Sequence, residues 1–497
     1  MGVVIKQSIK ATIHVYAGVI IGFITAVLVF PRVFTPEQVG LLSILTQISL
    51  IITQFGIMGL PGIITYYFFH FKDEEKAHHG LPIIMTWGTL IGCALSVLFL
   101  ILAKPWIILK YANPLFGEHY YQLLTLTTFS IIFVILDSYY KGFYKVVLAT
   151  FLKETFQRIL LLSAVLLFIY KYCSFDHYVI IYSLASAIPV VILLFAIIRD
   201  GHFPWKADWK FITPDLRNGM ITVGVFNVLA SMSIYSNNVI DNIMVGSIGG
   251  LKAGGIYATT ILFGSLVSIP SRTVKKITSA LAAEFWKEND ESKVLDIYKK
   301  SSVNLYIIGV LLFLGIWVNA DNIMQVLPKE YSAGKWAMFW ACLTNLMEML
   351  TAAASSILGT SKYYKVQTYQ GILLVGLMIL TNYLLIPIFG LTGAAMAATI
   401  SFFIFNTIRH LYIMYRWNMQ PFDIEIVYVS IIGLITYLII HFIPHFSFFM
   451  IDAVIRGAIV VLLFGCTIYF LKISPEINST TNAILKKVPF INKLIKI

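Results

Sequence analysis

The seventh long apolar segment of this chain, residues 218–245, is unusually rich in polar side chains. Asn227, Ser231 and Asn238 follow one another at spacings of four and seven, so they lie near one helical face. Asp241 follows close behind them. Polar groups are costly inside a bilayer, so such a face either lines a wet cavity for a substrate or an ion, or hydrogen-bonds to a neighbouring helix. The sequence leaves both interpretations open.

A second acidic side chain, Glu348, falls near the middle of the apolar segment 336–358. A carboxylate at that depth either exchanges a cation or a proton, or is held by a cationic partner in a structural ion pair. Asp241 and Glu348 are therefore the candidates for coupling to H+ or Na+. No other cofactor is expected.

Cations at the end of the eighth apolar segment suggest phosphate chemistry. Arg272 and Lys275 are three residues apart on one side of a helix, and both side chains bind phosphate strongly. Anchoring of this helix end to the membrane surface is the plainer interpretation. His14, Gln47 and Gln54 are further candidates for a cavity wall. We identify no catalytic constellation, no metal site and no nucleotide-binding motif.

The chain that carries these residues is apolar almost throughout. Hydrophobic residues make up 59% of its 497 residues and charged residues 12%, about half the charged fraction that is usual in soluble proteins. Apolar stretches long enough to cross a bilayer recur along the whole sequence, so we expect an all-α polytopic membrane protein with about 14 transmembrane helices. The expected spans are 9–30, 39–69, 83–103, 120–140, 155–170, 178–198, 218–245, 256–281, 301–320, 336–358, 367–388, 391–414, 426–443 and 453–471.

Positive charge is distributed unevenly between the two sides of these spans. The N-terminus and the segments after even-numbered spans hold 28 Lys and Arg, and the opposite side holds 8. The positive-inside rule then places both termini in the cytoplasm. We expect the basic excess to face anionic lipid and no nucleic acid. The four cysteines show no paired spacing, so neither a disulfide framework nor a metal site is predicted.

A polar segment and a weak internal repeat predict how the spans are grouped. Residues 199–217 separate two sets of six spans, and Gly40 and Gly255 open corresponding spans, 215 residues apart. Two six-helix repeats are one way to build an alternating-access transporter. The predicted parts are a lobe at 1–198, a cytoplasmic interfacial connector at 199–217, a lobe at 218–414, helices 13 and 14 at 415–471, and a basic cytoplasmic tail at 472–497.

Three stretches resemble the polysaccharide-transporter branch of the multidrug/oligosaccharidyl-lipid/polysaccharide exporter superfamily. Residues 31–68 contain PRVFTPEQVG and then a Gly-Leu turn, and residues 240–270 contain IDNIMVGSIGGLKAGGIYA. Residues 384–402 contain LLIPIFGLTGAAMAA. The order and spacing match over about the first 415 residues.

The resemblance implies two six-helix lobes, arranged as in the superfamily's multidrug (MATE) branch, around a central cavity in a bacterial inner membrane. It implies a flippase that moves an undecaprenyl-pyrophosphate-linked glycan from the inner to the outer leaflet by alternating access, for surface polysaccharide such as O-antigen, capsule or exopolysaccharide. A polysaccharide polymerase and chain-length machinery would then be partners. One departure matters, because lipid II flippases carry arginine in the first helix near the cavity. Here HVYAGVIIGF, residues 14–23, has none, which leaves open where pyrophosphate would be held.

Two other functions remain open from the residues. A cation-coupled multidrug antiporter would need cavity carboxylates, which Asp241 and Glu348 could supply. A membrane polysaccharide polymerase or ligase would act on the same lipid carrier, but such enzymes usually present a sizeable outside loop with catalytic residues. The longest outside loops here, 104–119 and 321–335, carry no obvious acid–base pair.

Overall fold

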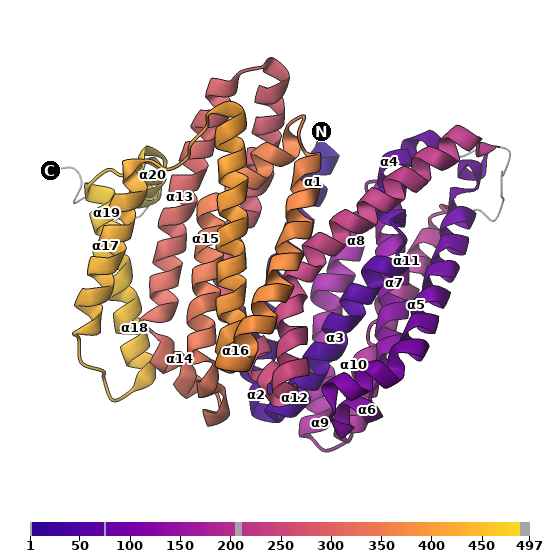
Figure 1. Cartoon of the computed structure of the whole chain (residues 1–497), viewed down its shortest axis with the longest axis horizontal. Helices are drawn as coiled ribbons and strands as arrows, with labels where there is room; N and C mark the ends of the chain where they lie inside the picture. Colours follow the sequence, from indigo (N-terminus) through magenta and orange to yellow (C-terminus); the bar gives the residue numbers. More distant parts are fainter. Residues whose placement is uncertain (1, 74–75, 204–210, 488–497) are drawn as a thin grey trace. The chain divides into compact units, whose positions relative to one another are not determined.

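The computed structural model describes residues 2–73, 76–203 and 211–487, and in these ranges the chain is helical without a strand (Figure 1). It forms two compact units, Met1–Thr259 and Thr260–Ile497, which are described separately below. The prediction of an all-α membrane protein is thereby confirmed. The lobes predicted on either side of 199–217 stay a prediction, and within that connector residues 204–210 lie outside the described part.

Unit 1 holds the helices from the N-terminus to the first part of α12. They are α1 (Gly2–Phe23), η1 (Ile24–Val29), α2 (Phe30–Val33), α3 (Pro36–Gly56), α4 (Leu60–Phe71), η2 (Ala77–Gly80), α5 (Leu81–Tyr111), α6 (Pro114–Glu118), α7 (Gln122–Gly142), α8 (Val147–Thr150), η3 (Phe151–Phe156), α9 (Gln157–Ile169), α10 (Phe175–Leu184), α11 (Ala187–Arg199) and α12 (Pro214–Glu288). The PRVFTPEQVG motif explains one boundary. Thr35 and Gln38 form a reciprocal capping box, and Pro36 occupies the first turn of α3.

Unit 2 holds the rest of α12 and all later helices. They are α13 (Glu291–Trp317), α14 (Ala320–Val326), η5 (Lys329–Gly334), α15 (Lys335–Thr360), α16 (Lys365–Trp417), α17 (Ile424–His441), α18 (Phe449–Val460), η6 (Val461–Gly465), α19 (Cys466–Phe470) and α20 (Pro475–Lys487). The helices α17 and α18 pack on α13, and α18 also contacts α14 (Figure 1).

Eleven helical stretches of the described chain are long and apolar enough to cross a membrane, so the expected count of fourteen is not confirmed. The difference has a physical origin. The long helices α12 and α16 each contain two expected spans, and only Gly250 and Gly390 interrupt their helical dihedral angles. The expected span at 155–170 coincides with α9, which follows directly on η3 with its Lys153 and Glu154.

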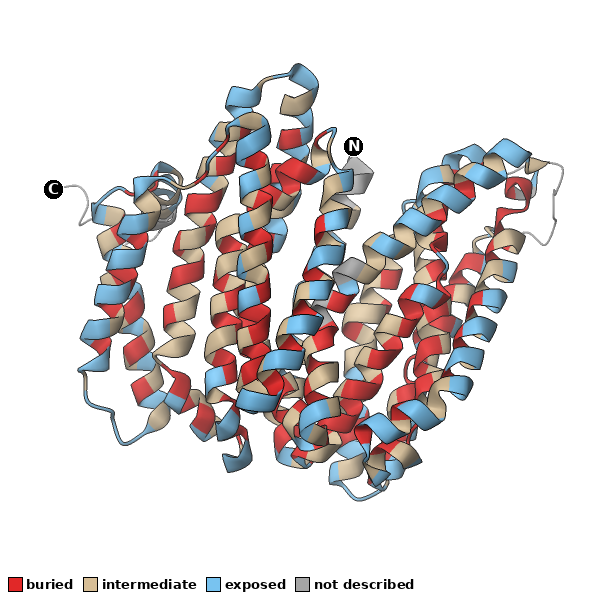
Figure 2. Cartoon of the chain, viewed as in Figure 1, coloured by how far each residue is buried: buried red, intermediate tan, exposed pale blue. Residues whose placement is uncertain are grey.

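Many of these helices carry large apolar side chains that are exposed. Figure 2 shows how exposed and buried positions alternate along the helices. On α5, Leu98, Leu102 and Leu109 are 52%, 70% and 77% exposed. A water-soluble protein rarely exposes such continuous apolar surface, whereas lipid tails solvate it readily. These outward faces are therefore lipid-facing surfaces.

The two glycines that suggested an internal repeat touch one another. A Cβ atom added to Gly40 on α3 would overlap the carbonyl oxygen of Leu251 on α12, and one added to Gly255 would overlap the carbonyl oxygen of Pro36. Each glycine therefore lets the other helix's backbone approach closely, as small residues do at helix–helix interfaces in membranes. The matching sequence positions mark a packing contact inside unit 1.

This contact predicts that Gly40→Ala destabilises the protein. The added methyl group meets backbone, which cannot move aside as a side chain can, so we expect a cost of about 1–3 kcal/mol. The thermal unfolding midpoint of the purified protein measures it. Gly376→Ala is the matched control, because a Cβ atom there meets open space. An equal midpoint for the two variants would contradict this account of the repeat.

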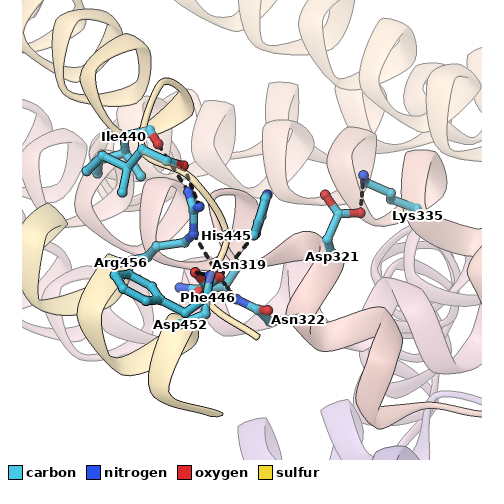
Figure 3. A network of polar contacts seen from close by, with 10 residues as sticks. Asn319, Asp321, Asn322, Lys335, Ile440, His445, Phe446, Asp452 and Arg456 are labelled. Carbon is cyan, nitrogen blue, oxygen red and sulfur yellow. Dashed lines mark hydrogen bonds and ion pairs between the residues drawn. The ribbon is translucent and has the colours of Figure 1, made fainter. Parts of the chain in front are cut away.

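A buried ion pair between Asp452 and Arg456 of α18 is hydrogen-bonded to Asn322 of α14 in unit 2 (Figure 3). Asp452 is fully buried and accepts hydrogen bonds from Arg456 Nε at 2.8 Å, Asn322 Nδ2 at 2.6 Å and the Phe446 amide at 3.0 Å. His445 Nδ1 lies 3.2 Å away on the same carboxylate. The remaining guanidinium nitrogens of Arg456 donate to backbone carbonyls at the end of α17, at 2.8 and 3.1 Å. Every charged atom of the pair therefore has a partner.

We expect Asp452→Ala to destabilise unit 2 strongly. It leaves the Arg456 guanidinium buried without its counter-ion, which costs about 3–5 kcal/mol. The double variant Asp452→Leu with Arg456→Met removes both charges and should unfold closer to the wild type, because an apolar pair of similar volume avoids the unpaired charge. Thermal unfolding of both variants tests this. A double variant that is no more stable than the single one would show that the hydrogen bonds outweigh the unpaired charge.

Candidate functional site

Unit 1 contains a cluster of five charged side chains on α7, η3 and α9. We call Asp137, Lys141, Lys153, Glu154 and Arg158 the Arg158 cluster. Lys141 Nζ lies 2.6 Å from Asp137 Oδ2, and Arg158 Nη2 lies 3.2 Å from Glu154 Oε2. Lys153 Nζ lies 5.4 Å from the centre of the Phe133 ring. Three cations and two carboxylates leave this cluster with an excess of positive charge.

Arg158 reaches across to the first helix. Its Nη1 donates to the carbonyl oxygen of Gly18 at 2.6 Å, and a Cβ atom on Gly22 would overlap its guanidinium. Thr155 donates to the carbonyl oxygen of His14 at 3.0 Å, next to the π-helical turn η3. The spacing Gly18-x-x-x-Gly22 gives α1 a face on which this polar segment can pack closely. The first helix α1 contains no arginine, but the Arg158 guanidinium of α9 is hydrogen-bonded to its backbone.

His14 takes part in the same contact through its backbone and its ring. Its ring packs edge-on to Phe151 with centres 5.1 Å apart. The sequence offered His14 as a cavity candidate, and the structure shows it in a packing contact with η3. Its role in substrate binding stays a prediction.

Ser43 on α3 accepts hydrogen bonds from polar side chains of both α3 and the first half of α12. Gln47 Nε2 and Asn242 Nδ2 both donate to Ser43 Oγ, at 2.8 and 3.3 Å. Gln54 is buried and donates to the carbonyl oxygen of Leu50 on its own helix. The Asn242 bond joins α12 to α3, whereas the Gln47 bond lies within α3.

The other predicted residues of α12 have local partners. Ser231 donates to the carbonyl oxygen of Asn227 at 2.6 Å. Asn227 lies against Gly62 of α4, where a Cβ atom would meet its amide group. Asp241 accepts from the Tyr257 hydroxyl at 3.3 Å. The side chain of Asn238 lies outside the described part of the structure, so the predicted stripe is only partly described.

Unit 2 brings together two residues that the sequence offered separately. Lys275 Nζ on α12 lies 2.5 Å from Glu348 Oε1 on α15, and both side chains are about one-third exposed. Ser356, two turns further along α15, donates to the carbonyl oxygen of Lys275 at 3.1 Å. The cationic partner that Glu348 was expected to need is therefore Lys275. Arg272, one turn earlier, is exposed.

Lys275 also lines a pocket of about 340 Å³. Hydroxyl and amide side chains make up most of its wall, namely Ser279, Ser355, Ser356, Thr360 and Gln367. Such a wall offers hydrogen-bond donors and acceptors beside one positive charge. It therefore suits a hydroxylated or phosphorylated group.

Arg409 on α16 was not among the predicted site residues, because it was considered only in the count of positive charges on the cytoplasmic side. The side chain is buried, and its guanidinium carbon lies 4.2 Å from the centre of the Phe405 ring. It interacts electrostatically with Glu348 and Tyr298. The signal in the sequence was an arginine inside the last apolar turns of a span, which is costly without a function or a partner. Together with Lys275 and Glu348 it forms what we call the Lys275 cluster, again with positive charge in excess.

Outside the spans, an ion pair joins the end of α11 to the turn after α7. Lys145 Nζ and the Tyr140 hydroxyl donate to Asp200 Oδ2 at 2.5 and 2.7 Å. These bonds hold the pKa of Asp200 below its usual value. The stability they contribute is present above the unfolded-state pKa and is lost as pH falls through the lowered folded-state pKa. We expect the difference in unfolding midpoint between wild type and Asp200→Asn to shrink as pH falls from 7 to 3.

In the described ranges, no three His, Cys, Asp or Glu side chains are arranged to hold a metal ion. The polar chemistry of both clusters is that of ammonium, guanidinium, carboxylate, hydroxyl and amide groups. Such groups bind and release a ligand by charge and hydrogen bonding. The arrangement therefore suits recognition of an anionic, hydroxyl-rich solute.

Comparisons with known proteins indicate the family and the fold of this chain. The model of a family described as polysaccharide biosynthesis protein matches residues 4–282. A solved structure of the lipid II flippase MurJ in an inward closed conformation aligns with a TM-score of 0.73 at 14% identity, over 95% of this chain and all of that one.

Two further solved structures align less closely. An inward-facing multidrug resistance MATE transporter of the MOP superfamily aligns with a TM-score of 0.64 at 12% identity, over 82% of this chain and 94% of that one. A MOP transporter from Pyrococcus furiosus, whose binding pocket is described as having reversed polarity, aligns with a TM-score of 0.55 at 13% identity, over 84% of this chain and 95% of that one. No curated protein sequence matches.

Proposed function

Because this chain belongs to the polysaccharide biosynthesis protein family and has the fold of MOP-superfamily transporters, we propose that it is a lipid-linked oligosaccharide flippase. It moves an undecaprenyl-pyrophosphate-linked repeat unit from the inner to the outer leaflet by alternating access, in the synthesis of surface polysaccharide. The observation that carries this proposal is the excess of cations over carboxylates in both the Arg158 cluster and the Lys275 cluster.

The pyrophosphate is the part of such a substrate that needs these cations. Its negative charges lose their hydration when the headgroup leaves water, and fixed guanidinium and ammonium groups replace that hydration. We assign Arg158 and Lys275 to this role. Arg158 projects its guanidinium onto α1, where the sequence left the position of the pyrophosphate open, and Lys275 adds a pocket of hydroxyl groups for sugar.

Coupling to an ion gradient is a second part of the proposal. Glu348 is engaged by Lys275, so a pyrophosphate that binds Lys275 competes with this carboxylate. The released Glu348 then binds H+ or Na+, which links substrate binding to cation binding. Asp241 is the other coupling candidate, and its partner is the hydroxyl of Tyr257.

The alternatives are less well supported by these contacts. A multidrug antiporter needs carboxylates that are available to organic cations, whereas Asp137, Glu154 and Glu348 are each paired with Lys or Arg. A polymerase or ligase needs an acid–base pair outside the membrane. The segment 321–335 instead pairs Asp321 with Lys335 at 2.5 Å.

Deletion of the gene tests the function directly. We expect lipid-linked repeat units to accumulate on the cytoplasmic leaflet and surface polysaccharide to be lost, with both restored by the wild-type gene. Normal polysaccharide with greater sensitivity to cationic drugs would indicate an antiporter. Accumulation of single repeat units on the outer leaflet would indicate a polymerase or ligase.

A further inference from the structure

A second cationic site in unit 1 shares no residue with the Arg158 cluster. A pocket of about 940 Å³ opens between the end of α2 and the turn that joins α9 to α10. Arg32, Lys171 and His177 line it, and its wall contains no carboxylate. The acid nearest in sequence, Asp176, pairs instead with His119 at 3.2 Å. The wall of the pocket thus carries three basic side chains and no acidic one.

The rest of the wall is largely apolar. Phe168, Ile169 and Ile181 form one side of the pocket, with Val33 at the end of α2 opposite. A ligand that fits must therefore combine a compact anion with hydrocarbon. A sugar chain would need many more hydroxyl and amide partners than this wall provides.

The place of the pocket in the fold matches a lipid headgroup. Candidate membrane spans end at Val33 and begin at Phe175, on either side of it. Tyr172 is 80% exposed at its rim, and tyrosines are enriched where a membrane meets water. The three basic residues therefore lie at or near the ends of candidate membrane spans, where lipid headgroups are expected.

The pocket is built on packed elements. The ring of Phe34, which directly follows α2, lies 4.9 Å from the ring of Phe168 on α9, and 4.8 Å from that of Tyr178 on α10. Both Phe34 and Tyr178 are buried. Ser174 caps α10, and its hydroxyl lies 2.7 Å from His177 Nδ1. The two walls of the pocket are therefore held together by the core of unit 1.

We propose that this pocket binds the phosphate headgroup of an anionic membrane phospholipid, with one acyl chain along Phe168 and Ile169. Arg32 and Lys171 contact the phosphate, and His177 adds a donor. By the distribution of charge, this face is the one predicted to lie outside the cytoplasm, opposite to the basic excess. The site is thus distinct from general attraction of the inner leaflet, and it does not depend on the transported substrate.

The test is lipid enrichment around the full-length protein. We expect phosphatidylglycerol to be retained over phosphatidylcholine when the protein is extracted from vesicles containing equal amounts of both and its bound lipids are counted by native mass spectrometry. Arg32→Ala with Lys171→Ala should remove at least one bound phosphatidylglycerol per protein. Lys110→Ala with Lys252→Ala is the matched control, because these two cations lie on the same predicted face and do not line the pocket.

Each other result overturns the proposal. Equal loss in both double variants would mean that surface charge alone attracts the lipid. No preference for phosphatidylglycerol in the wild type would mean that the pocket is not an anion site. Displacement of phosphatidylglycerol by an undecaprenyl-pyrophosphate glycan, but not by cardiolipin, would assign the pocket to the transported substrate instead.

Discussion

Arg158→Ala is expected to reduce transport of lipid-linked oligosaccharide about 10- to 100-fold, because hydrogen bonds to charged groups contribute about 1.5–3 kcal/mol each. The loss should come from weaker binding of the pyrophosphate. Transport by Arg158→Lys should lie between that of the wild type and that of Arg158→Ala, since lysine keeps the charge but loses the planar pair of donors. The measurement is uptake of a labelled undecaprenyl-pyrophosphate oligosaccharide in vesicles containing the purified protein.

Arg158 also packs against α1, so its structural role must be separated from its role in binding. Arg158→Met keeps the length of the side chain over Gly22 and removes the charge, and its unfolding midpoint reports the packing contribution. Arg199→Ala is the matched control, because Arg199 is 72% exposed at the end of α11. Transport by Arg158→Ala within twofold of the wild type would reduce Arg158 to a packing residue.

Contacts within one helix follow from spacing more readily than contacts between helices. The capping box of Thr35 and Gln38, for example, joins two residues that are three positions apart. The contact of Arg158 with Gly18 spans 140 residues, and no periodicity along the chain encodes it. Arg158 belongs to α9, yet its guanidinium is hydrogen-bonded to the backbone of the first helix, where the sequence has no arginine.

Pairing between charged residues was the least predictable part of the site. Lys275 and Glu348 were both candidates, but their spacing of 73 residues gave no reason to join them. Arg456 was counted as a charge on the outer side, yet it is neutralised by Asp452 inside the membrane-spanning part of unit 2. Charge counts treat each residue alone, whereas burial forces charges to find partners. The fold class was predictable because it depends on hydrophobicity, which adds up along the chain.

The close contact between Gly40 and Gly255 has a different origin, and whether the chain contains an internal repeat stays a prediction. Glycine is required where two backbones approach too closely for a Cβ atom. The contact between α3 and α12 therefore requires glycine in both helices, at Gly40 and at Gly255. The break at Gly390 in α16 has a similar cause, because its positive φ favours glycine. Where a close backbone approach or a positive φ permits only glycine, a single glycine in the sequence indicates the local backbone structure.

The second large effect is expected at Lys275. Lys275→Met should reduce transport about 10- to 100-fold, because it removes the charge that we assign to the pyrophosphate. Glu348→Gln should behave differently. It releases Lys275 from its ion pair, so we expect substrate to bind at least as tightly as in the wild type, while transport no longer responds to a pH gradient. Uptake with and without an imposed gradient measures both effects.

The double variant decides whether the two residues act as one device. If pyrophosphate and Glu348 compete for Lys275, then Lys275→Met with Glu348→Gln should lose no more transport than Lys275→Met alone, because the carboxylate has no role once its partner is gone. If the fold-losses of transport in the two single variants multiply in the double variant, then Lys275 and Glu348 act independently, and cation coupling is not linked to substrate binding through their ion pair. Arg272→Ala serves as the neighbouring control, since Arg272 is exposed one turn away. If Arg272→Ala loses transport while Lys275→Met transports normally, the residue that contacts the phosphate is Arg272 and not Lys275.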